Sequence, residues 1–379
     1  MSRQLTQHDE PVGRRVARWR LHRRMTQQML ADRLGKSKSW VDKVERGVRR
    51  LDRYPVVRDI AAVLRIDPAV LLDSHASASV STGLDGVDGV RAALARYHRR
   101  PTRTLSADEA RQRLTHAWLA YQHAHYTRLL QALPVLLDAT HTTTELLTPA
   151  YRITASVLVK LGEADLAWLA ADRAVTAAGG DPVHVGAATI SVTQALRALG
   201  RDRLALTAAV TAAATAADHS VRGTLLLQAA MAAAGFGDRR RALDLLDHAG
   251  ALTNRRIDRA DPHRTAFGPA AVLLARSRTA LHLGDAGEAI HHHENAMRHD
   301  DWPALTAEHR AAHLVDAACA YFRADHPTAA VRALTHAHTV APDEIRCRPA
   351  ARTLITDIAQ SGPAVAGMAR LTTLIGLTR

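Results

Sequence analysis

Histidine is the chemistry-bearing side chain that the chain uses most freely, with 22 copies. Three stand in a row at 291–293, and His309 and His313 have the i,i+4 spacing that puts two metal ligands on one face of a helix. Consecutive helical residues point about 100° apart, so the triplet cannot converge on one ion. His293 instead falls at a packed position of a repeat. We therefore predict a core imidazole there, a half-site at most at 309 and 313, and neither a metal nor another cofactor.

Nucleophilic and redox chemistry has little support in the sequence. Cys319 and Cys347 are the two cysteines, too few for a disulfide framework or a four-thiolate zinc site, and they suit a reducing cytoplasm. There is no phosphate-binding glycine motif, serine elbow or metalloprotease motif. The first residues hold no apolar export signal, and no stretch approaches the ~18 uncharged apolar residues of a membrane span. The sequence predicts a cytoplasmic protein that is not an enzyme and not a membrane protein.

Positive charge is concentrated at the start of the chain. Residues 1–73 hold 17 Lys and Arg against 9 Asp and Glu, whereas the remaining residues hold 33 against 28, within a net charge of +13. Three of the four lysines, Lys36, Lys38 and Lys43, fall within eight residues. A polyanion is the natural partner of such a cluster.

Helical patterns surround these lysines. Apolar residues recur at helical spacing from Val12, and Thr26 and Ser37 stand where the N-caps of two further short helices are expected. Gly35 can adopt the left-handed conformation that ends the first of these two helices, and Ala31 is small where the second crosses it. The residues expected to face inward are Leu30, Leu34, Val41 and Val44.

The stretch from Gln27 to Gly47 resembles the helix-turn-helix of the phage-repressor-like family, often called XRE. The pattern continues with apolar residues on a fourth helix (Val57, Ile60, Ala61 and Leu64) and with Asp67-Pro68, which would cap a fifth. The resemblance implies a five-helix DNA-binding domain in residues 1–73.

In this family the third helix enters the major groove of duplex DNA. The resemblance assigns base reading to Lys38, Ser39, Trp40 and Lys43, phosphate contacts to Ser37 and Gln27, and backbone contacts to Arg46, Arg49 and Arg50. Two alternatives stay open: Trp40 packs against the first helix, and the lysines and arginines are simply solvated.

The composition changes to Ser, Ala, Gly and Asp over residues 74–89, as in a flexible connection. Val90, Ala93, Leu94 and Tyr97 then suggest one short helix before Pro101, so we expect a linker with one helix over 74–105. No strand-like alternation follows, and alanine and leucine dominate to the end. The predicted fold class is all-α.

A repeat runs through residues 106–379. A turn residue is followed after five positions by alanine and after seven more by another alanine, with the turns at Gly162, Gly200, Gly237, Gly284 and Asp325. Seven positions before each turn the residue is again small: Ala155, Thr193, Ala230, Ser277 and Ala318. The turns at 237 and 284 resemble those of tetratricopeptide (TPR) repeats. We expect a TPR-like α-solenoid of about seven helical hairpins, with a concave groove.

The groove positions of TPR arrays, carried onto this sequence, are Arg152, Ser156, Gln194, Arg197, Met231, Arg278, Cys319 and Phe322. Arginines there could bind a carboxylate or phosphate while Met231 and Phe322 supply apolar contacts, so a peptide or small anionic ligand is expected. The alternatives are arginines paired with neighbouring acids, and an alanine-rich stack that binds nothing.

An XRE-like head joined to a TPR-like body resembles the peptide-sensing RRNPP regulators and the helix-turn-helix TPR regulators of actinomycetes. The resemblance implies a sequence-specific transcriptional regulator, a homodimer on a double-stranded DNA operator, with a ligand-sensing body. Peptide-sensing members use groove asparagines, but Asn254 and Asn295, the two asparagines here, are not at groove positions. The alternative function is a TPR interaction scaffold whose head localises it on DNA.

Overall fold

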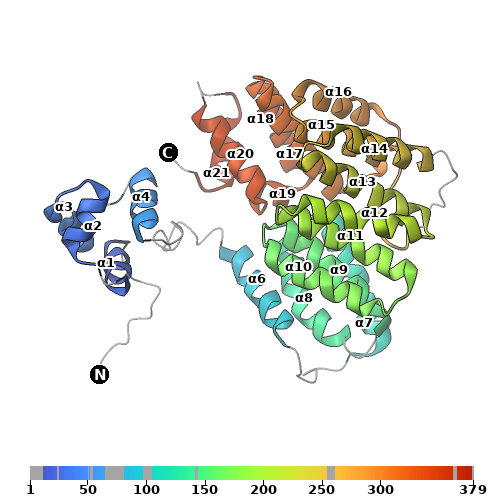
Figure 1. Cartoon of the computed structure of the whole chain (residues 1–379), viewed down its shortest axis with the longest axis horizontal. Helices are drawn as coiled ribbons and strands as arrows, with labels where there is room; N and C mark the ends of the chain where they lie inside the picture. The colour runs from blue at the N-terminus through green and yellow to red at the C-terminus, as the bar shows by residue number, and fades with distance from the viewer. Residues whose placement is uncertain are drawn as a thin grey trace. The chain divides into compact units, whose positions relative to one another are not determined.

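The computed structural model describes residues 12–23, 25–49, 51, 54–64, 81–96, 105–140, 144–253, 261–361 and 365–377. All regular structure in these ranges is helical, which confirms the predicted all-α class. The chain divides into two compact units, Met1–Ser81 and Thr82–Arg379, which we call the head and the body (Figure 1). None of the described helices has the length and apolar character needed to cross a membrane.

The head consists of short helices around a small apolar core. The helices are α1 (Val12–His22), α2 (Gln27–Leu34), α3 (Lys38–Glu45) and α4 (Tyr54–Leu64). As predicted, Thr26 and Ser37 cap α2 and α3, accepting hydrogen bonds from the backbone N–H groups of the third residue beyond each. Gly35 ends α2 at φ 61°. The predicted fifth helix, with Asp67-Pro68, lies outside the described residues.

Gly13 sets the distance between α1 and α3. A Cβ atom at this position would lie 1.9 Å from the backbone oxygen of Val44, closer than any real contact. The two helix backbones therefore touch where only glycine fits, which fixes how the third helix sits on the first.

The helix α6 (Ser81–Leu94) corrects the expected linker over 74–105. Residues 81–89, predicted to be flexible, are helical, and Val87, Val90 and Leu94 belong to the hydrophobic core of the body. A Cβ at Gly86 would lie 2.8 Å from the Cβ of Leu130, so the glycine permits close packing on the helix α8 (Tyr126–Thr140). The helix is a part of the body; Tyr97, predicted to extend it, lies outside the described residues.

The body is a succession of antiparallel helical hairpins, as predicted for the α-solenoid (Figure 1). The paired helices are α7 (Ala107–Gln122) with α8 (Tyr126–Thr140), α9 (Thr144–Lys160) with α10 (Ala164–Ala177), α11 (Pro182–Ala198) with α12 (Asp202–Thr215), α13 (His219–Gly235) with α14 (Arg239–Thr253), α15 (Pro269–His282) with α16 (Ala286–Arg298), α17 (Ala307–Arg323) with α18 (Pro327–Val340), and α20 (Pro349–Gln360) with α21 (Met368–Leu374). The short α19 (Pro342–Arg346) precedes the last pair, and a 3₁₀ turn at Trp302–Ala304 precedes α17.

The repeat geometry predicted from the turn residues is confirmed. Gly162, Gly200, Gly237 and Gly284 have φ between 67° and 86°, and Asp325 has φ 61°, a left-handed conformation that aspartate tolerates better than most residues. The small residues seven positions before the turns are all buried, and the alanines after the turns are buried except for the half-buried Ala212. Small side chains let neighbouring helices approach closely at these points.

The two ends of the array meet. The backbone N–H of Tyr126, at the start of α8, donates to Asp343 in α19 at 3.0 Å, and the Tyr126 hydroxyl donates to Glu344. Gly162 packs against Pro349, where an added Cβ would lie 3.0 Å from the proline ring. One hydrophobic cluster contains residues from α6 to α10 and from α17 to α21. The inner face of the array is therefore enclosed by its own ends.

Candidate functional site

The helix α3 buries one face and exposes the other. Val41 and Val44 each have 1% of their surface exposed, within the head. Lys38, Ser39 and Lys43 are exposed, as the predicted groove-facing positions require. The face opposite the core thus carries two lysine ammonium groups and a hydroxyl, all of which can donate hydrogen bonds.

Trp40, a predicted base-reading residue, is half-buried and packs against the apolar core of the head. The guanidinium of Arg49 lies 5.9 Å from the centroid of its indole ring, within cation–π range. Arg46 pairs with Asp42 at 2.5 Å on the exposed surface. Arg50 lies outside the described residues. Much of the Trp40 side-chain surface is therefore used in packing against the core, whereas Arg46 and Arg49 are exposed.

A buried ion pair joins α1 to the end of α3. The guanidinium of Arg20 donates to both carboxylate oxygens of Glu45, at 2.6 and 3.0 Å, and to the backbone oxygen of Met25 at 2.7 Å. Arg20 and Glu45 are 8% and 7% exposed. This pair could not be predicted from the sequence, because nothing in the helical spacing of Arg20 indicates a partner 25 residues away.

Gln27, a predicted phosphate contact, joins the same group of residues. Its side-chain amide donates to Glu45 at 2.8 Å, and the residue is half-buried at the first position of α2. Arg20, Gln27 and Glu45 thus tie the first three helices together, and the Gln27 side chain is positioned by Glu45.

The body contains a cavity of about 370 Å³, lined mainly by the first helix of successive hairpins, from α7 to α17. Six of the eight predicted groove residues line it: Arg152, Ser156, Gln194, Arg197, Met231 and Arg278. Cys319 and Phe322 do not line it. They pack against the main hydrophobic cluster, because α17 presents earlier residues, from Glu308 to Asp316, to the cavity.

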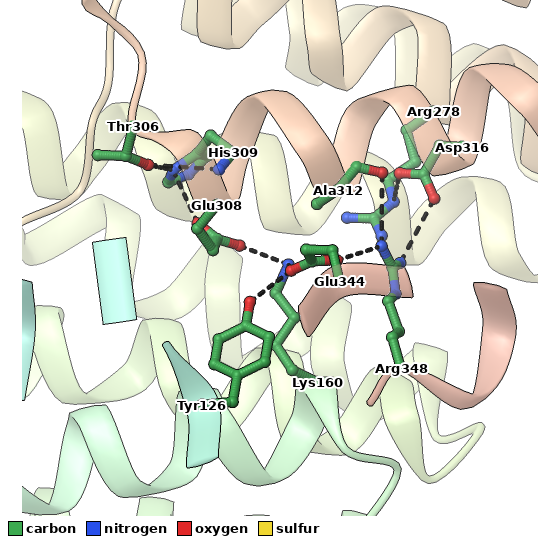
Figure 2. Close-up of polar contacts among 10 residues, drawn as sticks. All are labelled: Tyr126, Lys160, Arg278, Thr306, Glu308, His309, Ala312, Asp316, Glu344 and Arg348. Atoms are coloured by element: carbon green, nitrogen blue, oxygen red, sulfur yellow. Dashed lines mark hydrogen bonds and ion pairs between the residues drawn. The ribbon is translucent and has the colours of Figure 1, made fainter. Parts of the chain in front are cut away.

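A polar network lies where the ends of the array meet, on one wall of the cavity (Figure 2). The ammonium of Lys160 contacts Glu308 and lies 2.9 Å from Oε1 of Glu344. Arg348 contacts Glu344 at 3.2 Å and Asp316 at 3.4 Å. Arg278 lies 3.0 Å from Asp316. We call these residues the closing network.

Two carboxylates of the closing network, Glu308 and Asp316, are held ionised by neighbouring cations. Burial alone raises the pKa of Glu308, but Lys160 and His309 outweigh it, and the pKa is lowered. Burial likewise opposes ionisation of Asp316, whose pKa is lowered by Arg278 and Arg348. Lys160, Arg278 and Arg348 are thereby neutralised within the protein.

Two other cavity arginines have no carboxylate in contact within the described ranges. A terminal nitrogen of Arg152 donates to the backbone oxygen of His263 at 2.9 Å, and its guanidinium lies 5.6 Å from the Trp118 ring centroid. A terminal nitrogen of Arg197 donates to Gln228 Oε1 at 3.1 Å. Burial lowers the pKa of Arg152 and of Arg197 to about 10, so both are cations at neutral pH. Both Nε atoms are buried without a hydrogen-bond partner in the part of the chain described.

The histidines singled out in the sequence separate into different environments. His293 is buried, as predicted, and its Nδ1 lies 2.9 Å from Nε2 of His313. His309, expected to share a face with His313, contacts Thr306 and Glu308 instead. The described residues hold no group of three or more histidine, cysteine or acidic side chains arranged for a metal ion.

The geometry defines a helix-turn-helix head with a helical-repeat body. Residues 11–73 match the family described as a helix-turn-helix domain. A comparison with solved structures gave the crystal structure of Bacillus thuringiensis PlcR in complex with the peptide PapR7 and DNA, with 10% identity, a TM-score of 0.39, and coverage of 87% of this chain and 95% of that one. The curated proteins gave no match. The head of this chain is thus a helix-turn-helix domain, the class associated with binding duplex DNA.

Proposed function

We propose that this protein is a sequence-specific DNA-binding transcriptional regulator, with α3 as the helix that enters the major groove. The observation that carries the proposal is the exposed face of α3, where Lys38, Ser39 and Lys43 stand opposite a fully packed apolar face. Lysine donates to guanine O6 and N7, and serine hydrogen-bonds any base. The match of residues 11–73 to a helix-turn-helix domain also supports DNA binding by α3.

Phosphate contacts would come from residues around the turn and after α3. Ser37 is the N-cap of α3 and Gln27 is the first residue of α2. The backbone N–H groups that the caps leave unbonded at these helix starts suit a phosphate. Arg46 and Arg49 are exposed beyond α3, and the surface pair of Arg46 with Asp42 is a weak one that a phosphate can replace. These contacts supply affinity without sequence choice. Trp40, with one side on the core, would contribute only its outer edge.

The body would dimerise and receive a small ligand in its cavity. A dimer places two heads on half-sites about one helical turn of DNA apart. A ligand acts on such a protein by favouring one arrangement of the heads over another. The size of the cavity, about 370 Å³, lies at the lower end of the range for small-molecule sites and favours a small molecule over a peptide.

The test is an affinity measurement over a salt series, with the full chain, the DNA upstream of its own gene and a random duplex of equal length. A regulator prefers the upstream DNA by ~10³ or more. Equal affinity for both duplexes at every salt concentration would favour the scaffold function and overturn the proposal. Arg240→Ala, which removes an exposed charge of the body, is the control for non-specific loss of charge.

A further inference from the structure

The cavity of the body holds more positive than negative charge. Its wall includes Arg152, Lys160, Arg197, Arg264, Arg278 and Arg348, against the two lining carboxylates of Glu308 and Asp316. The buried carboxylate of Glu344 adds a third negative charge through Lys160 and Arg348. The closing network uses all three of these carboxylates. Among the described residues, Arg152 and Arg197 have no carboxylate in direct contact, and only Asp261, Asp202 and Asp316 act on them from a greater distance.

A buried cation without a counter-ion is costly, because the Coulombic attraction that would offset its lost hydration is missing. Arg152 is only 6% exposed, and Arg197 lies beside the cavity with its Nε unpartnered among the described residues. Two such groups in one cavity are hard to explain by stability, since an apolar side chain of similar length would fill either position.

The surroundings of the two arginines complete a site for an organic molecule. Gln194 precedes Arg197 by three residues on the same face of α11, and both line the cavity. Gln228 accepts from Arg197 through its Oε1 atom, which leaves its amide NH₂ group to donate. Trp118, Met231 and Phe267 add apolar surface. Donors and cations therefore stand beside aromatic and thioether groups.

The loop before α15 supplies one side of this cavity under strain. Arg264 and Ala266 have φ of 52° and 50°. Asp261 holds this backbone in place, because its carboxylate accepts hydrogen bonds from the backbone N–H groups of Thr265 and Ala266. Phe267 lies on Gly223, where a Cβ would fall 2.1 Å from the ring. Loops whose strained backbone is held in place by surrounding contacts are concentrated at ligand sites.

We propose that the cavity binds a small organic anion whose carboxylate or phosphate group is held by Arg152 and Arg197 and whose apolar part lies against Trp118, Met231 and Phe267. The anion supplies the directly bonded negative charge that neither arginine finds among the described residues. Arg278, although it lines the same cavity, is satisfied by Asp316 and does not hold the ligand. This inference deepens the sensing part of the proposed function, and it stands or fails independently of DNA binding.

The test is the thermal stability of the full chain titrated with inorganic phosphate and, separately, with succinate, in a buffer of low ionic strength. Binding at one site gives a saturable rise in the melting temperature of the body, ~2–4 °C at about ten times the dissociation constant. A rise with phosphate alone identifies a phosphate group, and a rise with succinate alone identifies a carboxylate. Non-specific salt stabilisation does not saturate and is the same in all variants.

Three variants sharpen the test. Arg152→Met and Arg197→Met keep the length of the side chain but remove its charge, and each should weaken anion binding ~10-fold or more because a charge-assisted hydrogen bond is lost. Without anion, neither should melt below the wild type, since an uncompensated charge has been removed. Arg278→Met is the matched control, which should melt lower and keep the full anion response.

The outcome that overturns the inference is the absence of a saturable rise with either anion in the wild type. Equal responses in the wild type and in the Arg152→Met, Arg197→Met double variant would overturn it as well. If the anion response is present while upstream and random DNA bind equally, the cavity assignment holds and the regulator function fails.

Discussion

The head and the body place their positive charge in opposite ways. In the head, Lys38 and Lys43 stand on the exposed face of a helix. The core beneath it, as far as the residues are described, is apolar apart from the ion pair of Arg20 with Glu45. In the body, alanine packs the helices together, and Arg152 and Arg197 are enclosed in a cavity. An exposed row of cations can meet an extended polyanion, whereas two cations that line a cavity of about 370 Å³ suit a small molecule. The exposure of the cation, more than its type, indicates the size of its partner.

Glu45→Ala should produce the largest effect and confine it to the head. The substitution leaves Arg20 buried without its counter-ion, which costs ~3–5 kcal/mol of unfolding free energy. Urea unfolding of the full chain should show the head transition at much lower urea and the body transition unchanged. Gln27 would lose its partner too, so DNA affinity should fall. An unchanged head transition would mean that the ion pair does not hold α1 to α3.

Acidification should destabilise the body through two buried histidines. Burial lowers the pKa of His293 to about 4, and burial together with His293 lowers that of His313 to about 3. Below pH ~6.5 the unfolded chain therefore binds protons that the folded chain does not, and the folded state loses ~2 kcal/mol per histidine by pH 5.

His309 acts in the opposite direction, because Glu308 outweighs the effect of burial and raises its pKa. The contribution of the buried pair is therefore isolated by comparison with a His293→Leu, His313→Leu double variant. Urea unfolding at pH 7.5 and pH 5 should show a smaller loss of body stability in the variant. The same loss in both proteins would contradict the burial of two neutral imidazoles.

Lys43→Ala should weaken binding to the upstream DNA by ~1–3 kcal/mol if the lysine reads a base. The side chain is exposed, so folding should not change. Binding of succinate or phosphate to the body should be unaffected, which separates the two cation sites. Fluorescence anisotropy with the labelled upstream duplex measures the effect, and unchanged affinity would remove Lys43 from the reading surface.

Arg46→Ala should have the smallest effect. Its exposed pair with Asp42 contributes little, so stability should change by less than ~1 kcal/mol. If Arg46 contacts a phosphate, the slope of log K against log salt should decrease in magnitude by about 1, equally for specific and random duplexes. A loss restricted to the upstream sequence would instead make Arg46 a base-reading residue.

Local features of this fold could be predicted from the sequence, and long-range ones could not. Thr26, Ser37 and the positive-φ turn glycines act within a few residues of their position, so their types identify caps and turns. The pairing of Arg20 with Glu45 and of Tyr126 with Glu344, 218 residues apart, depends on how whole helices meet. The same limit applies to α6, because its Ser-, Gly- and Asp-rich start is typical of a linker and its contacts with the body are made far along the chain.

The predicted groove residues show both outcomes, since some line the cavity and two do not. The repeat positions brought Arg152, Gln194, Arg197 and Arg278 to the cavity because each lies on the inner face of its own helix. Cys319 and Phe322 occupy equivalent positions on α17, but α17 presents Glu308 to Asp316 to the cavity. Cys319 and Phe322 pack against the main hydrophobic cluster instead. Repeat spacing cannot indicate that an array closes.

The central claim is that α3 enters the major groove of duplex DNA. The most direct measurement tethers an iron–EDTA cleavage reagent to Ser39→Cys in the full chain, with Arg240→Cys on the exposed body surface as control. Burial raises the pKa of Cys319, and that of Cys347 to about 12, so these thiols react slowly with the reagent. The account predicts strong cleavage of both upstream strands inside the segment that the protein protects, from position 39 only. Cleavage from position 39 no stronger than from position 240 would contradict it.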